Sequence, residues 1–186
     1  KNNNVVATVS STQTLPGNST KTFNQTTPAV ANPALWNPAT PNMYHAVTTV
    51  FNGASAVDSY DTPFGFRWFR WTATNGFYLN GSHVYLYGAN VHQDHAGWAN
   101  AATDAGAARD VSLVKQAGLN FIRGSHYPHS PAFADACDTA GVCLWSEFPF
   151  WGLGGASGEG GWAGSSSYPT VAADQAPFEA SVKQGL

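Results

Sequence analysis

The chain of 186 residues is long enough for one large or two modest domains, and its 8 basic and 11 acidic side chains leave a net charge of −3. That balance provides no basic stripe for phosphates, so nucleic acid is excluded as a partner. No apolar run approaches the roughly 20 residues of a membrane span, so no membrane partner is expected. The first residues also lack the basic end and apolar middle of a signal peptide, and we expect the chain to begin inside a domain.

The first third of the chain has the composition of short β-strands. Val5–Val9 and Thr20–Gln25 are rich in Val and Thr and are bounded by Gly, Pro and Asn. Tyr44–Phe51 alternates its faces as a half-buried strand does, and Ala54–Tyr60 is its expected hairpin partner across an Asn-Gly turn. Because no helical pattern occurs here, we predict that residues 1–66 form a β-sandwich whose N-terminal part is missing.

Strands and helices alternate in the second part of the chain, residues 67–186. A small hairpin is expected around the Asn80-Gly81 turn, and Pro and Gly mark the ends of the helical patterns beyond it. A succession of strand–helix units predicts a parallel sheet with crossover helices. The predicted elements are strand Tyr85–His92, helix Ala107–Ala117, strand Leu119–Ile122, helix Pro131–Ala140, strand Val142–Trp145 and helix Ala173–Gln184.

Three polar clusters follow the predicted parallel strands. They are Asn90–His95, Arg123–Ser130 and Glu147–Trp151. In parallel α/β folds, ligands bind at the carboxyl ends of the strands. We therefore expect the three clusters to converge on one site although they lie far apart along the chain.

Three kinds of site are compatible with these clusters. A metal site would use nitrogen and oxygen ligands, but no compact spacing such as HExxH is present, and we predict no metal. Ser125 beside His126 suggests a nucleophile and its base, but the nucleophile-elbow motif is absent, and adjacent residues at a strand end point to opposite sides. Sugar recognition would use polar side chains for hydroxyl groups and aromatic rings for stacking; the aromatic content of 13% fits this site or a large buried core. The candidate ligands or contacts are Asn90, His92, Asp94, His95, Arg123, His126, Glu147 and Trp151.

Asparagine sequons and cysteines raise the question of covalent modification. Asn18 and Asn24 begin N-x-S/T sequons, which are either chance matches or glycan sites of a secreted protein, whereas the sequon at Asn80 is better explained by its turn. Cys137 and Cys143 would form a disulfide if their Cα atoms lie within about 7 Å; the alternative is two buried thiols.

Several short motifs occur in a fixed order over about residues 35–186. Each is weak alone, but their order and spacing together resemble glycoside hydrolase family 2, the β-galactosidase/β-glucuronidase group. The motifs are Leu35-Trp36-Asn37-Pro38, Pro41-Asn42-Met43-Tyr44, Phe64-Gly65-Phe66-Arg67, Phe77-Tyr78-Leu79-Asn80-Gly81, Gly88-Ala89-Asn90-Val91-His92-Gln93-Asp94, Arg109-Asp110 with Lys115, the run from Asn120 to Pro131, and Ala136-Cys137-Asp138.

This resemblance implies a multidomain β plus α/β architecture. An immunoglobulin-like β-sandwich would be followed by the first three βα units of a (β/α)8 TIM barrel. The implied activity of the longer parent enzyme is retaining, exo-acting hydrolysis of terminal β-linked sugars. We expect a β-galactosidase first, because the visible lip is aromatic and neutral and a uronate would want a cation. The alternatives are a β-glucuronidase or related enzyme, and a non-catalytic carbohydrate-binding homologue.

The resemblance also implies roles for single residues. His92 and His126 match histidines that contact substrate hydroxyls, and Arg123 matches an arginine near the nucleophile. Asn90 and Asp94 are candidates for the pocket wall. The family's acid/base and nucleophile glutamates are expected beyond Leu186.

The segment from Glu147 to Trp151 departs from the magnesium-binding pattern of related bacterial enzymes. Glu147 is expected to contact substrate or to orient a histidine or arginine, and Trp151 is expected to provide an aromatic wall. We therefore expect no cofactor. The expected partners are a β-glycoside substrate and the rest of the same polypeptide, and the sequence leaves self-association into a homo-oligomer open. The two sequons favour a secreted, extracellular glycoprotein.

Overall fold

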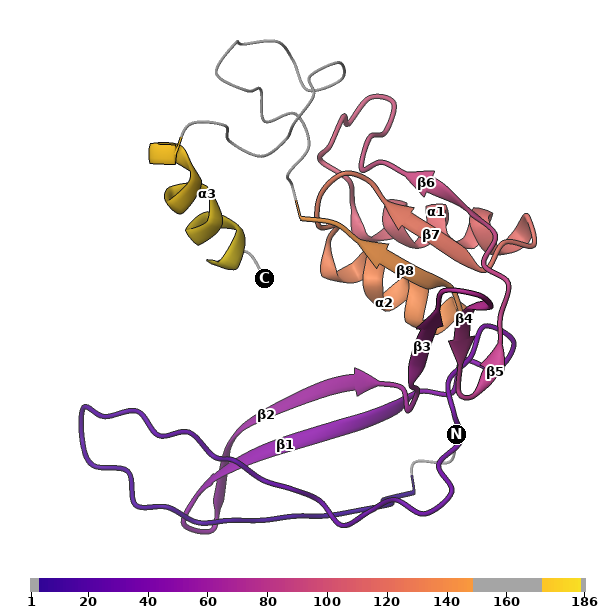
Figure 1. Ribbon diagram of the computed structural model, residues 1–186. Helices are drawn as coiled ribbons and strands as arrows, with labels where there is room; N and C mark the ends of the chain where they lie inside the picture. Colours follow the sequence, from indigo (N-terminus) through magenta and orange to yellow (C-terminus); the bar gives the residue numbers. More distant parts are fainter. Residues whose placement is uncertain (1–3, 149–171, 185–186) are drawn as a thin grey trace.

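The computed structural model describes residues 4–148 and 172–184. Within these residues the antiparallel strands form two separate units (Figure 1). A long hairpin and a small three-stranded sheet follow each other along the chain, and the hairpin matches its prediction closely. The strands are β1 (Tyr44–Asn52) paired with β2 (Ser55–Phe64), then β3 (Phe69–Thr72), β4 (Gly76–Leu79) and β5 (Ser82–His83) in that order.

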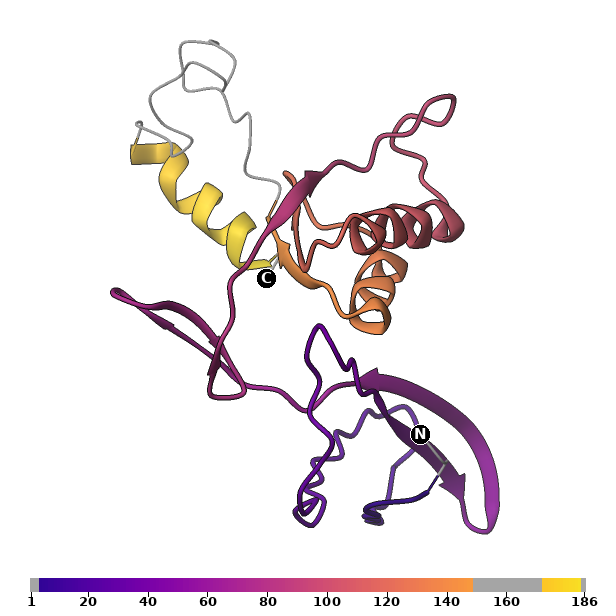
Figure 2. The same cartoon turned by 90° about the vertical axis from the view of Figure 1, so that its right-hand side faces the viewer.

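A parallel sheet with helices α1 (Asp104–Gln116) and α2 (Pro131–Ala140) on one face follows in the second half of the described chain (Figure 2). Its strands are β6 (Gly88–Val91), β7 (Phe121–Gly124) and β8 (Cys143–Ser146). The β6–α1 and β7–α2 units agree with the predicted βα succession. The connection from β8 to the last helix, α3 (Ala172–Gln184), lies outside the described residues, so the third unit stays a prediction.

The hydrophobic core lies between the parallel sheet and the two helices. Helix α1 contributes one apolar stripe, α2 contributes a second, and β7 presents Ile122 from the sheet. Val91 and Leu144, on the flanking strands, pack against the same cluster. The buried members are Ala107, Val111, Val114, Ile122, Phe133, Cys137 and Val142. None of the described helices is both long enough and apolar enough to cross a membrane.

Side-chain caps set the ends of the two helices. Thr103 caps α1 by accepting a hydrogen bond from the Gly106 N–H at 3.1 Å, so the helix starts three residues before the predicted Ala107. Ser130 caps α2, with Pro131 at its first turn. Gly141 ends α2 with φ of +73° in the left-handed region, and the predicted bounds of this helix are confirmed.

The predicted strands Val5–Val9 and Thr20–Gln25 are wrong, because residues 4–30 form no strand pair in the described part of the chain. Val5 is 81% exposed. Val and Thr favour extended backbone, but a strand also needs a neighbour that accepts its N–H groups. The hairpin β1–β2 is therefore what the described residues contain of the predicted sandwich, and its immunoglobulin-like form stays a prediction.

The largest fully buried side chain belongs to Trp36, which precedes β1 in the chain but contacts α2. Its indole N–H donates to the carbonyl of Asp138 at 2.7 Å. The guanidinium of Arg67 lies over the indole, 4.3 Å from the ring centroid, and pairs with the Asp138 carboxylate at 3.5 Å. Burial raises the pKa of the Asp138 carboxyl, and Arg67 opposes that rise. A Cβ at Gly65 would come within 2.8 Å of the Trp36 Cβ, so this close approach requires glycine.

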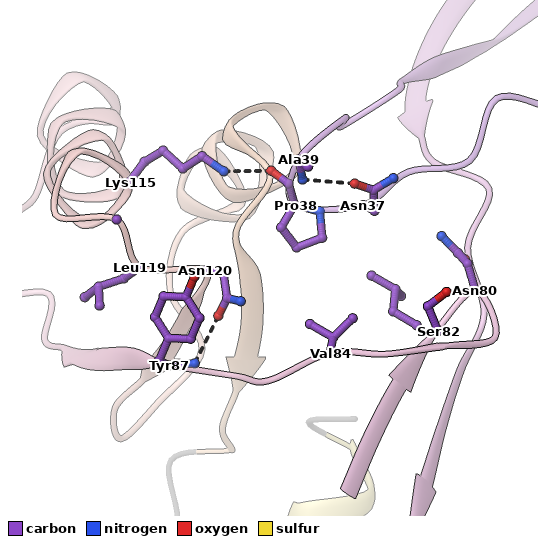
Figure 3. A pocket seen from close by; sticks show the side chains of 12 residues that line it. Asn37, Pro38, Ala39, Asn80, Ser82, Val84, Tyr87, Lys115, Leu119 and Asn120 are labelled. Atoms are coloured by element: carbon purple, nitrogen blue, oxygen red, sulfur yellow. Dashed lines mark hydrogen bonds between the residues drawn. The ribbon is translucent and has the colours of Figure 1, made fainter. Parts of the chain in front are cut away.

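The segment around Trp36, residues 35–41, is held against the helices at a second point. We call this segment the Trp36 loop. The Lys115 ammonium, in the last turn of α1, donates to the carbonyls of Pro38 at 2.7 Å and Gly141 at 3.2 Å. Figure 3 shows the bond from Lys115 to Pro38. The Trp36 loop is therefore bonded to both helices that cover the parallel sheet.

Replacing Trp36 by Phe in the intact parent protein should lower the thermal midpoint by several degrees. The phenyl ring keeps most of the buried area but leaves the Asp138 carbonyl without its indole donor, which costs about 1–3 kcal/mol. The measurement is thermal unfolding followed by circular dichroism. Trp68→Phe is the matched control, because Trp68 is 54% exposed; equal shifts for the two variants would contradict the proposed role of the loop.

Candidate active site

The register of the parallel sheet aligns the three predicted polar clusters. Asn90 on β6 lies opposite Arg123 on β7, and Arg123 lies opposite Trp145 on β8. Val91, Gly124 and Ser146 are the last paired residues of the three strands. His92, Ser125 and Glu147 therefore all follow at the same edge of the sheet. The expected convergence at the carboxyl ends of the strands is present in the structure.

Strand alternation places these side chains on the face of the sheet opposite α1 and α2. Ile122 and Leu144 contact the helix-covered core. Successive side chains of a strand point to opposite faces, so their neighbours Arg123 and Trp145 point away from the helices. Trp145 was not among the predicted site residues, although the alternation in the sequence Cys-Leu-Trp-Ser contains the signal for it.

Arg123 forms the centre of the site. Its Nε donates to Glu147 Oε1 at 2.5 Å and its Nη2 donates to Glu147 Oε2 at 2.9 Å, a two-point contact between planar groups. The same Nη2 lies 2.9 Å from His126 Nδ1. The carboxylate of Glu147 is thus bound to a cation and oriented through both of its oxygens.

The two candidate histidines contact each other. The rings of His92 and His126 meet edge to face, with centroids 5.1 Å apart and planes at 71°. Asn90, His92 and Asp94 line an open cavity of about 460 Å³ between β6 and α1, where Asp110, Leu113 and Val114 form its other side. The structure thus brings Asn90, His92, Arg123, His126 and Glu147 to one edge and places Asp94 beside that cavity. The remaining predicted site residue, Trp151, lies outside the described residues.

His95, a candidate metal ligand in the sequence, is an anchor for the loop after β6. Its Nε2 lies 3.1 Å from the Asp110 carboxylate on α1, and its ring stacks on Trp98. Asp110 was noted in the sequence only as part of a motif, because its partner could not be read from a local pattern. Among the described residues no group of three His, Cys, Asp or Glu side chains is arranged to hold a metal ion.

The loop between β7 and α2 contributes His126 to the candidate site, and its remaining side chains make packing contacts. His129 stacks between Tyr127 and Phe133, with ring centroids 5.4 Å and 4.6 Å away. The Tyr127 hydroxyl accepts the backbone N–H of Gln93 at 3.0 Å, which joins this loop to the loop after β6. Ser125 is 0% exposed, and the peptide bond that follows it is cis. A fully buried hydroxyl does not suit an attacking nucleophile, so the geometry gives no support to a Ser125–His126 pair.

A larger cavity of about 530 Å³ lies at the opposite, amino end of the parallel strands (Figure 3). The Trp36 loop, β5 and the start of β7 surround it. Its polar side chains already serve the backbone: the Asn120 amide bonds to Tyr87 N–H and Tyr85 C=O, and Asn80 donates to the Trp36 carbonyl. This cavity lies where the Trp36 loop, the antiparallel sheet and the parallel sheet meet. The candidate active-site residues lie at the other end of the parallel strands.

Of the two states that the sequence left open, the structure contains free thiols at Cys137 and Cys143. Cys137 is buried in the helix-covered core. Leu144 points into that core, so its strand neighbour Cys143 points to the opposite face. Burial raises the pKa of Cys137 to about 12, and burial likewise raises the pKa of Cys143.

Cys137 should resist alkylation by iodoacetamide at pH 8 in the native intact protein and react readily in denaturant, because the reactive form is the thiolate. Its folded pKa lies above the ordinary value of 9.0. Its contribution to the free energy of unfolding should therefore be complete below pH 9 and be lost as the pH rises toward 12. Peptide mapping by mass spectrometry measures the labelling. A Cys137–Cys143 cross-linked peptide would contradict the free-thiol assignment.

Two family models match the chain. The model described as glycosyl hydrolases family 2 matches residues 1–67, and the model described as the TIM barrel domain of glycosyl hydrolases family 2 matches residues 72–183. Similar solved structures point the same way. The crystal structure of a Bacteroides uniformis beta-glucuronidase has a TM-score of 0.62 and 41% identity, over 64% of this chain and 14% of that one.

Curated relatives carry two activity names. A putative beta-glucuronidase of Formosa agariphila is 38% identical over 70% of this chain and 16% of its own length. A beta-glucuronidase of Bacteroides fragilis is 34% identical over 84% of this chain and 21% of its own length. A beta-galactosidase of Bacteroides ovatus is 36% identical over 66% of this chain and 14% of its own length. The chain thus spans about a fifth or less of these relatives.

Proposed function

Because the chain belongs to glycosyl hydrolase family 2, we propose that the intact protein containing it is a retaining, exo-acting β-glycosidase. Part of the family's N-terminal sandwich domain and part of its TIM barrel account for the sequence. We propose a domain division of residues 1–66 and 67–186. The observation that carries the function is the cluster of Arg123, Glu147 and His126 at the carboxyl edge of the barrel strands.

The described residues supply recognition rather than the bond-breaking carboxylates. Retaining hydrolysis needs two carboxyl groups about 5–5.5 Å apart, one as acid/base and one as nucleophile. Both carboxylate oxygens of Glu147 already accept hydrogen bonds from Arg123, so neither is directed at a glycosidic bond. Asp94 lines the cavity beside β6 together with Asp110, but the Asp110 carboxylate is already paired with His95. We therefore assign the catalytic pair to other segments of the intact protein.

Asn90, His92 and His126 suit the hydroxyl groups of a sugar ring. Amide and imidazole groups make directional hydrogen bonds without a fixed charge. Trp145, on the same face as Arg123, offers an aromatic surface of the kind that stacks on a pyranose. Asp94 can accept from hydroxyl groups at the edge of the cavity, and Trp151 remains a proposed wall residue.

We propose a β-glucuronoside as the first substrate and a β-galactoside as the second. Our sequence prediction had the opposite order, on the basis of an aromatic, neutral lip. The relatives named above favour the glucuronoside, because the two relatives that match the larger share of this chain are named as beta-glucuronidases. The guanidinium of Arg123 is occupied by Glu147, so a cation for the uronate carboxylate would come from another segment of the intact protein.

Other attributes of the intact protein stay proposals. Asn18 and Asn24 are exposed in the described chain, which is compatible with glycosylation of a secreted protein. A binding protein without catalysis is the second candidate function, since the described residues supply contacts to sugar hydroxyls.

The intact protein should hydrolyse 4-nitrophenyl β-D-glucuronide with a higher kcat/KM than the β-D-galactoside. The sugar first released should be the β-anomer, as retention requires. Release of nitrophenolate measures the rates, and proton NMR of the fresh product measures the anomer. An α-anomer as first product would overturn the retaining mechanism, and binding without turnover would favour the binding protein.

His126→Ala in the intact enzyme should lower kcat by about 100-fold or more while changing KM less, because a contact that strengthens in the transition state acts on kcat. His83→Ala is the matched control, since His83 is an exposed histidine on β5. Steady-state kinetics separate the two parameters. A rise in KM with unchanged kcat would contradict this role for His126.

A further inference from the structure

The guanidinium of Arg123 contacts a histidine and a carboxylate with the same nitrogen. Nη2 donates to Glu147 Oε2 and lies 2.9 Å from His126 Nδ1. A guanidinium has hydrogen-bond donors and no acceptor. The contact at 2.9 Å is therefore a hydrogen bond only if Nδ1 of His126 carries its lone pair.

We propose that Glu147 and Arg123 are positioning residues that hold His126 as the neutral ring with its proton on Nε2. This inference rests on the proposed function and deepens it, because it fixes what His126 offers to the substrate. The ring is then a hydrogen-bond donor at Nε2, and it recognises an oxygen that accepts. Glu147 acts through Arg123 rather than by touching the sugar, which is the second of the two roles that the sequence left open for it.

The groups that face His126 favour this tautomer over the charged ring. Arg123 Nη2, at 2.9 Å from Nδ1, is closer than Glu147 Oε2, at 3.6 Å. A separation of 3.6 Å is too long for a hydrogen bond. A protonated Nδ1 would place two N–H donors against each other. The ring of His92, which meets His126 edge to face, adds no negative charge. The side chain of His126 is 17% exposed, so water screens the guanidinium only partly.

Glu147 is needed because it fixes the plane and direction of the guanidinium. Two hydrogen bonds from Nε and Nη2 leave Arg123 one orientation relative to the carboxylate. In that orientation Nη2 reaches Nδ1. Lysine in place of arginine could not make the same pair of contacts with a planar carboxylate and the ring together.

His129 provides an internal control three residues away. Its Nδ1 lies 3.2 Å from the carbonyl oxygen of Tyr127, which only accepts, so this nitrogen must carry the proton. The two histidines of one loop should therefore show opposite tautomers. Sequence alone gives no reason for the difference, since both stand in the same short polar run.

The first test is the ring-nitrogen NMR spectrum of the intact protein labelled with ¹⁵N-histidine at pH 7. His126→Gln and His129→Gln assign the two signals by their disappearance. We expect protonation at Nε2 for His126 and at Nδ1 for His129. In Arg123→Met the donor to Nδ1 is removed, so the preference for the tautomer protonated at Nε2 should be lost. A wild-type His126 that is protonated at Nδ1, alone or on both nitrogens, would overturn the proposal.

The second test uses turnover by the intact enzyme on its best nitrophenyl glycoside. The Gln side chain can place an amide N–H near the position of Nε2, whereas Asn reaches only the position of Nδ1. We expect His126→Asn to lose about 100-fold or more in kcat and His126→Gln to lose about tenfold. Equal losses, or a smaller loss for Asn, would refute the role of Nε2–H.

The two tests separate this proposal from the proposed function. If the wild-type protein hydrolyses none of the glycosides, the function fails, and the NMR experiment still decides the tautomer. If hydrolysis occurs and the NMR spectrum shows the other tautomer, the positioning role fails alone.

Discussion

The register of β6, β7 and β8 is the constraint on which the site depends. Parallel pairing aligns Asn90, Arg123 and Trp145 in one row across the face opposite α1 and α2. It also makes all three strands end together, which brings His92 and Glu147 to one edge. A slip of one residue in β7 would exchange Ile122 and Arg123 between the core and the site, burying a guanidinium among apolar side chains. Core packing and site geometry are therefore fixed by the same alternation.

The chain uses its few charges in compact groups. Arg123 binds Glu147, Arg67 binds Asp138, and Lys115 binds two carbonyl groups. Each cation contacts elements that are far apart in sequence, so each acts as a cross-connection. Surface ion pairs contribute little to stability in general. These contacts instead fix orientation. Each cation is either planar or bonded at more than one point, and so it holds the loops and helix ends that it joins in one arrangement.

The sequence predicted the local elements well where caps and turns were explicit. Pro131–Ala140 has the predicted bounds because Pro and Gly mark both ends, whereas α1 begins earlier than its apolar pattern because Thr103 supplies a cap. Convergence of the polar clusters also followed from topology. Pairings between distant residues did not: the contact of Glu147 with Arg123 was one of two open roles. The disulfide was likewise one of two open states, and the thiols are free because Cys137 of α2 lies in the core while Cys143 of β8 points to the other face of the sheet. Val5–Val9 failed because propensity cannot supply a strand partner.

The boundary between the two matching family models does not coincide with the boundary between packed units, because the Trp36 loop packs across it. Residues 1–67 match the sandwich model, yet Trp36 is buried against α2 and Pro38 is bonded to α1 through Lys115. A recombinant hybrid that exchanged the barrel at residue 67 would separate the indole from the helix that surrounds it. Exchange between relatives should therefore preserve Trp36, Arg67 and Asp138 as one inherited set, and a sandwich brought from another protein would have to carry a matching loop.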